Sequence, residues 1–338
     1  MNESTAPESS GSSADFAVSA QEAGLRLDVV LSARFQHASR ASLQTVIRRG
    51  AATVNGLRRK PADTVCENDR IHVDFPPEDP EEILPWSVDL DILHEDEDML
   101  VVNKPPGLVV HPTRGHQDDT LVNVLLAHDS ASFEAMIDAE RRPGIVHRLD
   151  KDTSGVLVVA RCERARQTLK AAFAERTVEK TYLAVVLGEF DDMGGRIESP
   201  IGRHPVNRKK MTVVREGGKP AITLYRVLGN SRGLSLVEVR ILTGRTHQIR
   251  VHFACERHPV FGDALYGGRQ RGLDVEAPRQ MLHAWKLALP HPSTGLWTHF
   301  IAPPPEDFLH VLAEADLPRI APTRYPPVGT DLNRTTRE

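Results

Sequence analysis

The apolar positions near the N-terminus repeat with the period of an α-helix. RLDVVLSARF (26–35) carries four apolar side chains at helical spacing, which predicts a short amphipathic helix. RASLQTVIRRG (40–50) predicts a second helix, with Ser39 as its N-cap and Gly50 at its end. ATVNGLRR (52–59) predicts a β-hairpin around an Asn-Gly turn, and RIHVDF (70–75) predicts a further strand. These elements together predict a small domain of two helices followed by strands.

The pattern changes after Asp89, where short apolar runs typical of strands dominate. Two helices are expected within this region, at 120–128 and 164–177. The predicted strands are MLVVNKP (99–105), GIVHRL (144–149), GVLVVAR (155–161), TYLAVVLGEF (181–190), ITLYRVLGN (222–230) and LSLVEVRILTG (234–244). Since strands and helices do not alternate regularly, the sequence favours an α+β fold with a mixed, largely antiparallel sheet.

Charge divides the chain into parts. Residues 24–60 hold eight basic residues and one acidic residue, whereas residues 77–98 hold ten acidic residues and no basic ones. The second stretch also contains three prolines, which is typical of a linker. The expected organisation is a disordered leader (1–15), a small basic domain (16–76), a linker (77–88), a larger domain (89–316) and a tail (317–338).

Composition excludes several classes of protein. The 338 residues are 40% hydrophobic and 26% charged, which suits a globular protein, and no apolar run is long enough to span a membrane. The N-terminus does not resemble a signal peptide. Three widely spaced cysteines indicate neither a disulfide framework nor a zinc site, so we expect a reducing, cytoplasmic environment. The net charge of −4 does not by itself indicate a nucleic-acid partner.

Two local basic clusters do indicate such a partner. In the small domain, Arg40 and Arg48 lie on one helix face and Arg49 follows. In the larger domain a basic hairpin is expected near 200–219, with Arg203, His204, Arg208 and Lys209 among its residues. A merely solvated surface would also be basic, but the concentration of charge favours contact with nucleic-acid phosphates.

The first candidate for catalysis is HRLDKDTSG (147–155), a polar segment between two apolar runs. Asp150 would lie on a rigid connection within reach of a cleft. A turn aspartate that caps its own backbone is the alternative, and Asp152 fits that alternative better because Thr-Ser-Gly follows it. Spacing alone does not choose between these two interpretations.

The second candidate is LTGRTHQIRVHFACERHP (242–259), which predicts a helix that opens at Thr246 and stops before Pro259. Arg245 would lie at its start, where a guanidinium could keep Asp150 charged and oriented or could simply face solvent. His247 and His252 are five residues apart, which does not fit a helical zinc site. Tyr182 fits either a core position or a platform for a stacked base. HEDEDML (94–100) could suggest a metal site, but it is more typical of a solvated strand start.

Several of these segments together resemble one family. HRLDKDTSG resembles the signature of the RluA-type family of RNA pseudouridine synthases, and EKTYLAVV (179–186) and GRTHQIRVHF (244–253) resemble that family's second and third motifs. NKPPGLVVHP, IGRHP and FGDALYGG are similar as well, so the resemblance runs from about residue 24 to residue 312. The small domain resembles an S4 RNA-binding domain. Within the family the chain most resembles the large-subunit ribosomal RNA synthases of the C and D types, and IGRHPVNRKKM (201–211) is nearer to the D type.

The resemblance implies a role for four residues. Asp150 matches the catalytic aspartate of the family, and Arg148 matches the arginine that enters the stack where the target base has left. Tyr182 matches the tyrosine that stacks under the flipped uracil and can serve as a base, and Arg245 is expected to pair with the aspartate. The implied partner is RNA, no metal or organic cofactor is implied, and a monomer is expected.

The implied reaction moves uracil from an N1 to a C5 glycosidic bond, which requires the base to be flipped out of its stack. The carboxylate could attack C1′, add to C6 or take a proton at C2′, and the sequence does not decide among these routes. Two alternatives remain: an RNA-binding protein without catalysis, and a glycosylase that releases free base.

Overall fold

The structure is a computed structural model, and it describes residues 13–35, 38, 40–75, 83–113, 115–137, 141–267 and 273–320. The chain divides into two compact units, Met1–Glu82 and Ile83–Glu338, which are described separately below. Among the described residues, no helix combines the length and the apolar character that crossing a bilayer requires.

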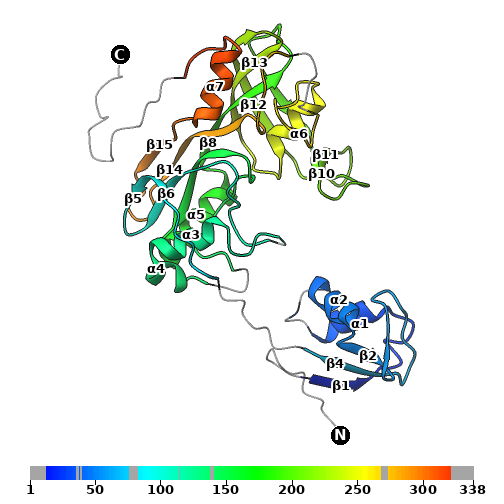
Figure 1. Cartoon of the computed structure of the whole chain (residues 1–338). Coiled ribbons are helices and arrows are strands. Elements are labelled where there is room, and N and C mark those ends of the chain that lie inside the picture. The colour runs from blue at the N-terminus through cyan, green and yellow to red at the C-terminus, as the bar shows by residue number, and fades with distance from the viewer. Residues whose placement is uncertain are drawn as a thin grey trace. The chain divides into compact units, whose positions relative to one another are not determined.

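The small unit pairs two helices with a four-stranded antiparallel sheet of order β1-β4-β2-β3 (Figure 1). Its elements are β1 (Ser13–Ala17), α1 (Leu27–Arg34), α2 (Arg40–Arg49), β2 (Ala52–Val54), β3 (Leu57–Arg58) and β4 (Arg70–Asp74). The apolar helix positions are buried against the sheet, as the 3.6-residue period predicted. Asn55 and Gly56 both have positive φ, which confirms the predicted turn.

The first strand was missed by the sequence analysis. Strand β1 begins at Ser13, inside the segment that was expected to be a leader. Of its residues only Ala14 and Phe16 pack against the core, and Ser13, Asp15 and Ala17 are exposed, so the apolar alternation is short and weak. The predicted cap Ser39 lies outside the described residues.

The larger unit is built on a nine-stranded sheet of order β5-β6-β7-β14-β8-β13-β12-β9, with β15 paired to β14 (Figure 1). Every pairing is antiparallel except that of β7 with β14, so the sheet is mixed and largely antiparallel as expected. The strands are β5 (Asp91–Glu95), β6 (Met99–Lys104), β7 (Ser154–Ala160), β8 (Glu179–Leu187), β9 (Gly194–Glu198), β12 (Ile222–Ser231), β13 (Leu234–Ile241), β14 (Leu282–Pro290) and β15 (Trp297–Ile301).

Both faces of this sheet are covered, because β8 sends alternate side chains into two different cores. Tyr182, Ala184 and Val186 join one core, whereas Leu183 and Val185 join the other. Figure 1 shows α3, α4 and α5 together beside β5 and β6, whereas α7 lies beside β12 and β13. The remaining elements are α3 (Leu121–His128), α4 (Ser130–Glu134), α5 (Glu163–Glu175), α6 (Gln248–Cys255), α7 (Glu306–Glu314) and a separate hairpin, β10 (Ile201–Arg203) with β11 (Met211–Val213).

The predicted strand GIVHRL does not form. Only Ile145 makes a single bridge, to Val159. Gly144 has φ +70°, and the His147 ring accepts the Val158 N–H at 3.0 Å, so a side chain takes the bond that a paired strand would make. The segment is therefore an irregular connection held against β7.

The boundaries of the larger unit also differ from those expected. Ile83, placed in the linker by the sequence analysis, is buried in the larger core, and the Asn123 side chain binds the Leu84 carbonyl at 2.8 Å. At the other end, Leu317 is still buried and Ile320 still packs against the core that contains α7. The rest of the expected tail lies outside the described residues.

Candidate active site

Asp150 lies on a connection whose backbone is fixed by hydrogen bonds at Asp150 and Lys151. The Asp150 carbonyl accepts the Thr153 N–H at 3.1 Å, and the Lys151 carbonyl accepts both the Gly107 N–H and the Lys104 ammonium at 3.0 Å. Leu149 is buried beside it, whereas the Asp150 side chain keeps one fifth of its surface exposed. The carboxylate is thus accessible while its backbone is fixed.

Gly155 allows this connection to enter the sheet. It has φ +117°, and a Cβ there would lie 2.1 Å from the Ala284 carbonyl oxygen on β14. The only parallel pairing among the described strands, between β7 and β14, begins at this close approach. A glycine at the end of HRLDKDTSG is therefore a steric requirement.

The Asp150 carboxylate is paired with Arg250, on helix α6. Arg250 Nη1 donates to Asp150 Oδ2 at 2.8 Å, and its Nε and Nη2 donate to the two oxygens of the fully buried Asp263, at 2.6 and 3.0 Å. Burial opposes the charge of this guanidinium, but the hydrogen bonds and charges of the two carboxylates outweigh it and raise the pKa of Arg250. Arg250 is a permanent cation fixed between two acids.

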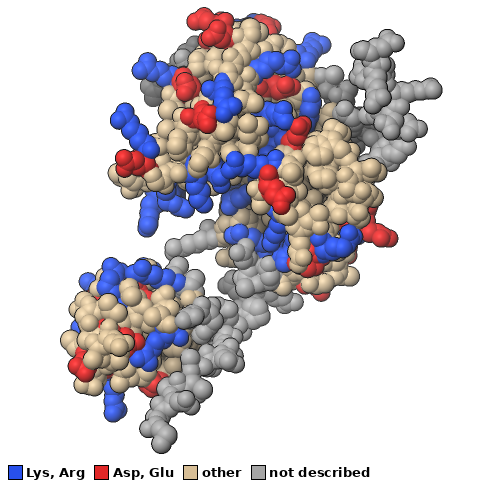
Figure 2. All heavy atoms as spheres, turned by 180° about the vertical axis from the view of Figure 1, so that it is seen from behind, with Lys and Arg blue, Asp and Glu red and all other residues tan. Residues whose placement is uncertain are grey.

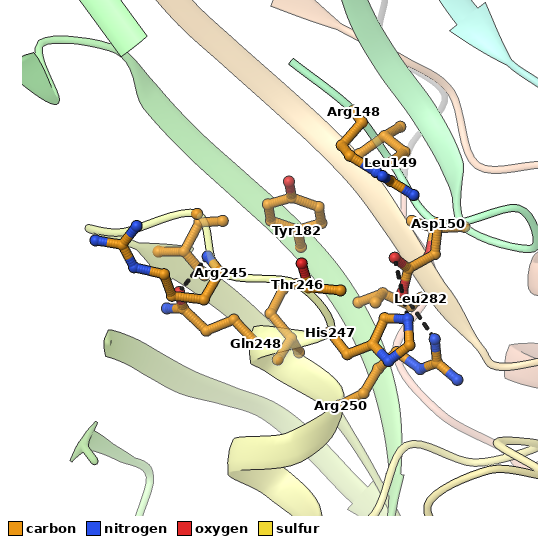
Figure 3. Close-up of a pocket in the computed structure, with 14 residues that line it drawn as sticks. Arg148, Leu149, Asp150, Tyr182, Arg245, Thr246, His247, Gln248, Arg250 and Leu282 are labelled. Carbon is orange, nitrogen blue, oxygen red and sulfur yellow. Dashed lines mark hydrogen bonds and ion pairs between the residues drawn. The ribbon is translucent and has the colours of Figure 1, made fainter. Parts of the chain in front are cut away.

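The expected pair between Asp150 and Arg245 is a wrong prediction. Arg245 donates its Nε to the Pro220 carbonyl at 3.2 Å, and Figure 3 shows its side chain directed away from Asp150. The helix also begins later than predicted, at Gln248, after a left-handed residue at His247 with φ +55°. One sequence feature could have suggested the true partner: Arg250 stands between the apolar residues Ile249 and Val251, and an arginine that such neighbours bury needs a counter-charge.

A pocket opens in front of the Asp150 carboxylate. Its lining includes Arg148, Tyr182 from β8, and residues 244–250 at the start of α6. In Figure 3, Arg148 lies on the same side of the pocket as Asp150, Tyr182 lies across the pocket from both, and His247 and Arg250 lie next to the Asp150 carboxylate. Arg148 is exposed, while Tyr182 is 9% exposed. Burial and the charge of Asp150 raise the pKa of Tyr182, so its phenol is neutral at physiological pH.

Comparisons with known proteins give the same result over most of the chain. The family model for RNA pseudouridylate synthases matches residues 98–255 and the model for the S4 domain matches residues 25–71. The ribosomal large subunit pseudouridine synthase D of Pseudomonas aeruginosa is 44% identical over 302 residues, covering 86% of this chain and 92% of the relative. The chain belongs to the RNA pseudouridine synthase family.

Other relatives agree with this assignment. A protein of the same name from Xylella fastidiosa is 43% identical over 86% of this chain and 89% of the relative. Among solved structures, human RNA pseudouridylate synthase domain containing 1 superposes with a TM-score of 0.53 at 32% identity, over 65% of this chain and 86% of that chain. The synthase is therefore an isomerase that acts on RNA, with an S4 domain followed by a pseudouridine synthase domain.

The basic hairpin of the synthase carries four of the predicted RNA-binding residues. Arg203, Arg208 and Lys209 are exposed, and the Arg203 guanidinium donates to the Arg208 carbonyl at 3.3 Å. The His204 ring is engaged in the turn, where its Nδ1 accepts the N–H groups of Val206 and Asn207. Figure 2 shows Lys and Arg side chains on the projecting hairpin and along the adjoining surface of the larger unit.

The S4 domain holds three more of the predicted RNA-binding residues, and their surroundings differ. Arg40 donates to the buried Asp28 from α2 to α1 and is about half exposed, while Arg48 donates to Gln44 at 3.0 Å. Arg49 is exposed at the end of α2. Burial disfavours the Asp28 carboxylate, but hydrogen bonds from Arg26, Gln44 and Arg40 outweigh it and lower the pKa of Asp28 to about 2. Arg40 therefore also holds the two helices together.

One group in the described part of the synthase has the residue types of a metal site. The Nε2 atoms of His94 and His291 lie 2.6 and 2.9 Å from Asp96 Oδ2. However, His291 Nδ1 accepts the N–H groups of Ser293 and Thr294, which leaves the proton on Nε2 and directs it at Asp96. A protonated nitrogen does not bind a metal ion, so this group is best described as hydrogen-bonded side chains that close a turn.

Proposed function

We propose that the synthase converts uridines of large-subunit ribosomal RNA to pseudouridine, with Asp150 as its catalytic carboxylate. The observation that carries this proposal is the fixed pairing of a partly exposed Asp150 with a buried Arg250, at the edge of a pocket next to Tyr182. The RNA class follows from the relatives, whose names assign them to the large ribosomal subunit.

The reaction breaks the bond from ribose C1′ to uracil N1 and forms a bond from C1′ to C5, with N1 gaining a proton and C5 losing one. A base in a helix cannot undergo this change, so the nucleotide must be flipped out. We infer that the exposed guanidinium of Arg148, two residues before Asp150, fills the gap left in the RNA stack. Extrusion and chemistry would then depend on one fixed piece of backbone.

Asp150 faces the flipped nucleotide as a carboxylate held by Arg250, whichever of the three routes is followed: attack at C1′, addition at C6, or removal of the C2′ proton. Tyr182 supplies a ring under the uracil. Because its phenol keeps its proton, a role for Tyr182 as a phenolate base is disfavoured and stacking is its proposed role. The pocket must exclude water during this step, since hydrolysis would release free uracil.

Phosphate contacts are proposed for Arg40, Arg48 and Arg49 of the S4 domain and for Arg203, His204, Arg208 and Lys209 of the hairpin. The polar groups of His204 and Arg40 already form hydrogen bonds within the protein. We propose that these two residues mainly shape the RNA-binding surface. A monomer in the cytoplasm, where ribosomal RNA is made and folded in bacteria, completes the proposal.

The test uses ribosomal RNA transcribed with uridine that carries tritium at C5. Conversion to pseudouridine releases tritium to water and leaves the RNA chain intact, whereas a glycosylase would release labelled uracil. Large-subunit RNA is expected to release tritium at a few defined uridines, and small-subunit RNA is not. Equal release from both RNAs would contradict the proposed substrate, and labelled uracil would contradict the proposed chemistry.

A further inference from the structure

Tyr266 connects the basic hairpin to the active site. Its hydroxyl accepts the Met211 N–H of β11 at 2.8 Å and lies 2.8 Å from His247 Nδ1. Its backbone N–H donates to Asp263 Oδ1, and the Arg250 guanidinium lies over its ring at 5.1 Å from the centroid. The tyrosine thus contacts the hairpin on one side and the groups that hold Asp150 on the other.

The proton arrangement in this set of contacts can be derived. Burial raises the pKa of Tyr266, so the phenol keeps its proton, and its oxygen already accepts from Met211. If the phenol donates to His247 Nδ1, the imidazole proton lies on Nε2, which is 3.7 Å from Asp150 Oδ1. The opposite tautomer would point a nitrogen lone pair at the carboxylate, which is repulsive. The chain of contacts therefore ends in an N–H directed at Asp150.

His247 is held in this place by its backbone. Its φ of +55° is uncommon for a residue other than glycine, and it lies immediately before the first turn of α6. The ring lies 2.8 Å from the Tyr266 hydroxyl through Nδ1 and 3.7 Å from Asp150 Oδ1 through Nε2, and Figure 3 shows it beside the Asp150 carboxylate. Four charged groups surround the ring: Asp150, Arg250, Asp263 and Arg148. Burial lowers the pKa of His247, with Asp150 opposing and Arg250 adding to this effect, so the ring is neutral at pH 7.

The hairpin contacts Tyr266 and α6, and its strand β10 also bonds to Lys219 in the segment that leads to β12. Strands β10 and β11 form a sheet of their own, outside the nine-stranded sheet. A small apolar cluster seats the hairpin on α6, and it consists of Ile201, Met211, Val213, Ala221, Val251 and Tyr266. Because Tyr266 belongs both to this cluster and to the hydrogen-bonded chain, the position of the hairpin and the position of His247 are set together.

We propose that Tyr266 and His247 are positioning residues that link the seating of the β10–β11 hairpin to the orientation of the Asp150 carboxylate. RNA held by Arg208 and Lys209 stabilises the seated hairpin, and the seated hairpin fixes the N–H of His247 against Asp150. This inference rests on the proposed catalytic role of Asp150. It means that RNA bound to the hairpin, outside the pocket, favours the chemical step at Asp150 inside the pocket.

The test compares Tyr266→Phe, His247→Asn and the double variant, using tritium release under saturating RNA and under limiting RNA. Asparagine is chosen because it tolerates the left-handed backbone. Each single variant is expected to lower kcat by about tenfold with KM unchanged, since a misplaced catalytic group costs turnover more than binding. The double variant is expected to fall no further, because both substitutions break one chain of contacts. Additive losses in the double variant would overturn the link.

The connection to the hairpin is tested by adding Arg208→Ala and Lys209→Ala. In the otherwise unchanged protein, these substitutions are expected to raise KM and also to lower kcat. In the Tyr266→Phe background they are expected to raise KM alone, because the path to Asp150 is already broken. An equal fall in kcat in both backgrounds would overturn the proposal.

Two controls separate the possible failures. Tyr225→Phe removes a phenol hydroxyl from β12, outside the pocket lining, and is expected to leave kcat unchanged. Asp150→Asn tests the proposed function itself. If Asp150→Asn remains active, the role of Asp150 is wrong. If Asp150→Asn is inactive and Tyr266→Phe has normal kcat, only the link is wrong.

Discussion

The buried charge of Arg250 fixes the orientation of the carboxylate at the candidate active site. It contacts two carboxylates, and one of them, Asp263, is fully buried. Removing the guanidinium would leave that carboxylate buried without a counter-charge, which costs about 3–5 kcal/mol. It would also free Asp150 from its fixed orientation. Arg250 is therefore expected to contribute to both stability and chemistry, and the two effects can be measured separately.

Arg250→Ala is expected to lower the unfolding free energy by about 3–5 kcal/mol and to abolish tritium release. Arg245→Ala is the matched control, because Arg245 lies five residues away and donates to the Pro220 carbonyl. It is expected to change the unfolding free energy by no more than about 0.5 kcal/mol. Denaturant unfolding and tritium release measure the two effects. If Arg245→Ala proves the more harmful of the two, the assignment of the Asp150 partner is wrong.

Individual residues also show how much of the candidate site could be predicted from the sequence. Asp150, Arg148 and Tyr182 were found because they stand in motifs, and the structure brings all three to one pocket. Arg245 was assigned as the partner of Asp150 because it was expected at the start of a helix that opens at Thr246 and because it was matched to an arginine of the family motif, whereas Arg250 was not considered. The left-handed His247 delays the helix and turns the residues before it outward, and no periodic pattern encodes such a backbone change.

At the scale of elements, strands with continuous apolar runs were predictable, and so was the edge strand β3 because a turn signal precedes it. The edge strands β1 and β9 and the interior strand β14 were not predicted. Strands β6, β7 and β8 lie inside the sheet and are almost wholly buried, so their sequences are strongly apolar. Strand β1 is an edge strand with alternating exposed residues, and β9 is an exposed edge strand that begins with two glycines. Pairing of these edges depends on neighbours that are distant in sequence.

Asp28 joins the two helices of the S4 domain, which makes the stability of that domain depend on pH. The folded pKa of Asp28 is about 2 and its ordinary value is 3.8, so the folded protein favours the carboxylate. The stabilisation is complete above about pH 4 and is lost as the pH falls through 2. Because the partner arginines are about half exposed, solvent screening keeps it near 1 kcal/mol.

Asp28→Asn is therefore expected to destabilise the S4 domain by about 1 kcal/mol at pH 7. The difference from the unchanged protein is expected to shrink below pH 4 and to be lost as the pH falls through 2, because the folded protein then protonates the Asp28 carboxyl group. Thermal unfolding followed across this pH range measures it. A difference that stays constant down to pH 2 would show that the carboxylate charge is not the cause.

At the scale of the whole molecule, we expect an acidic chain to bind RNA through local basic surfaces. The net charge is −4, yet the S4 domain and the hairpin each concentrate arginine and lysine. Binding that depends on such contacts releases counterions, so affinity falls steeply with salt. The S4 domain is expected to add affinity, and the larger domain is expected to supply the chemistry.

Arg48→Gln together with Arg49→Gln, in the full-length protein, is expected to weaken RNA binding and to reduce the slope of log affinity against log salt by about 1 to 2. The kcat at saturating RNA is expected to stay unchanged. Arg226→Gln, at an exposed position of β12 paired with Glu238, is the matched control and is expected to leave the slope unchanged. An unaltered slope in the Arg48 and Arg49 variant would remove these residues from the RNA interface.

The central claim is that the Asp150 carboxylate carries out the chemistry, and Asp152 in the same connection offers the most direct comparison. Single-turnover tritium release is measured for Asp150→Asn and Asp152→Asn, with RNA affinity measured in parallel. The account predicts that Asp150→Asn binds RNA normally and releases no tritium, while Asp152→Asn still turns over. Normal release by Asp150→Asn, or loss of release by Asp152→Asn alone, would contradict it.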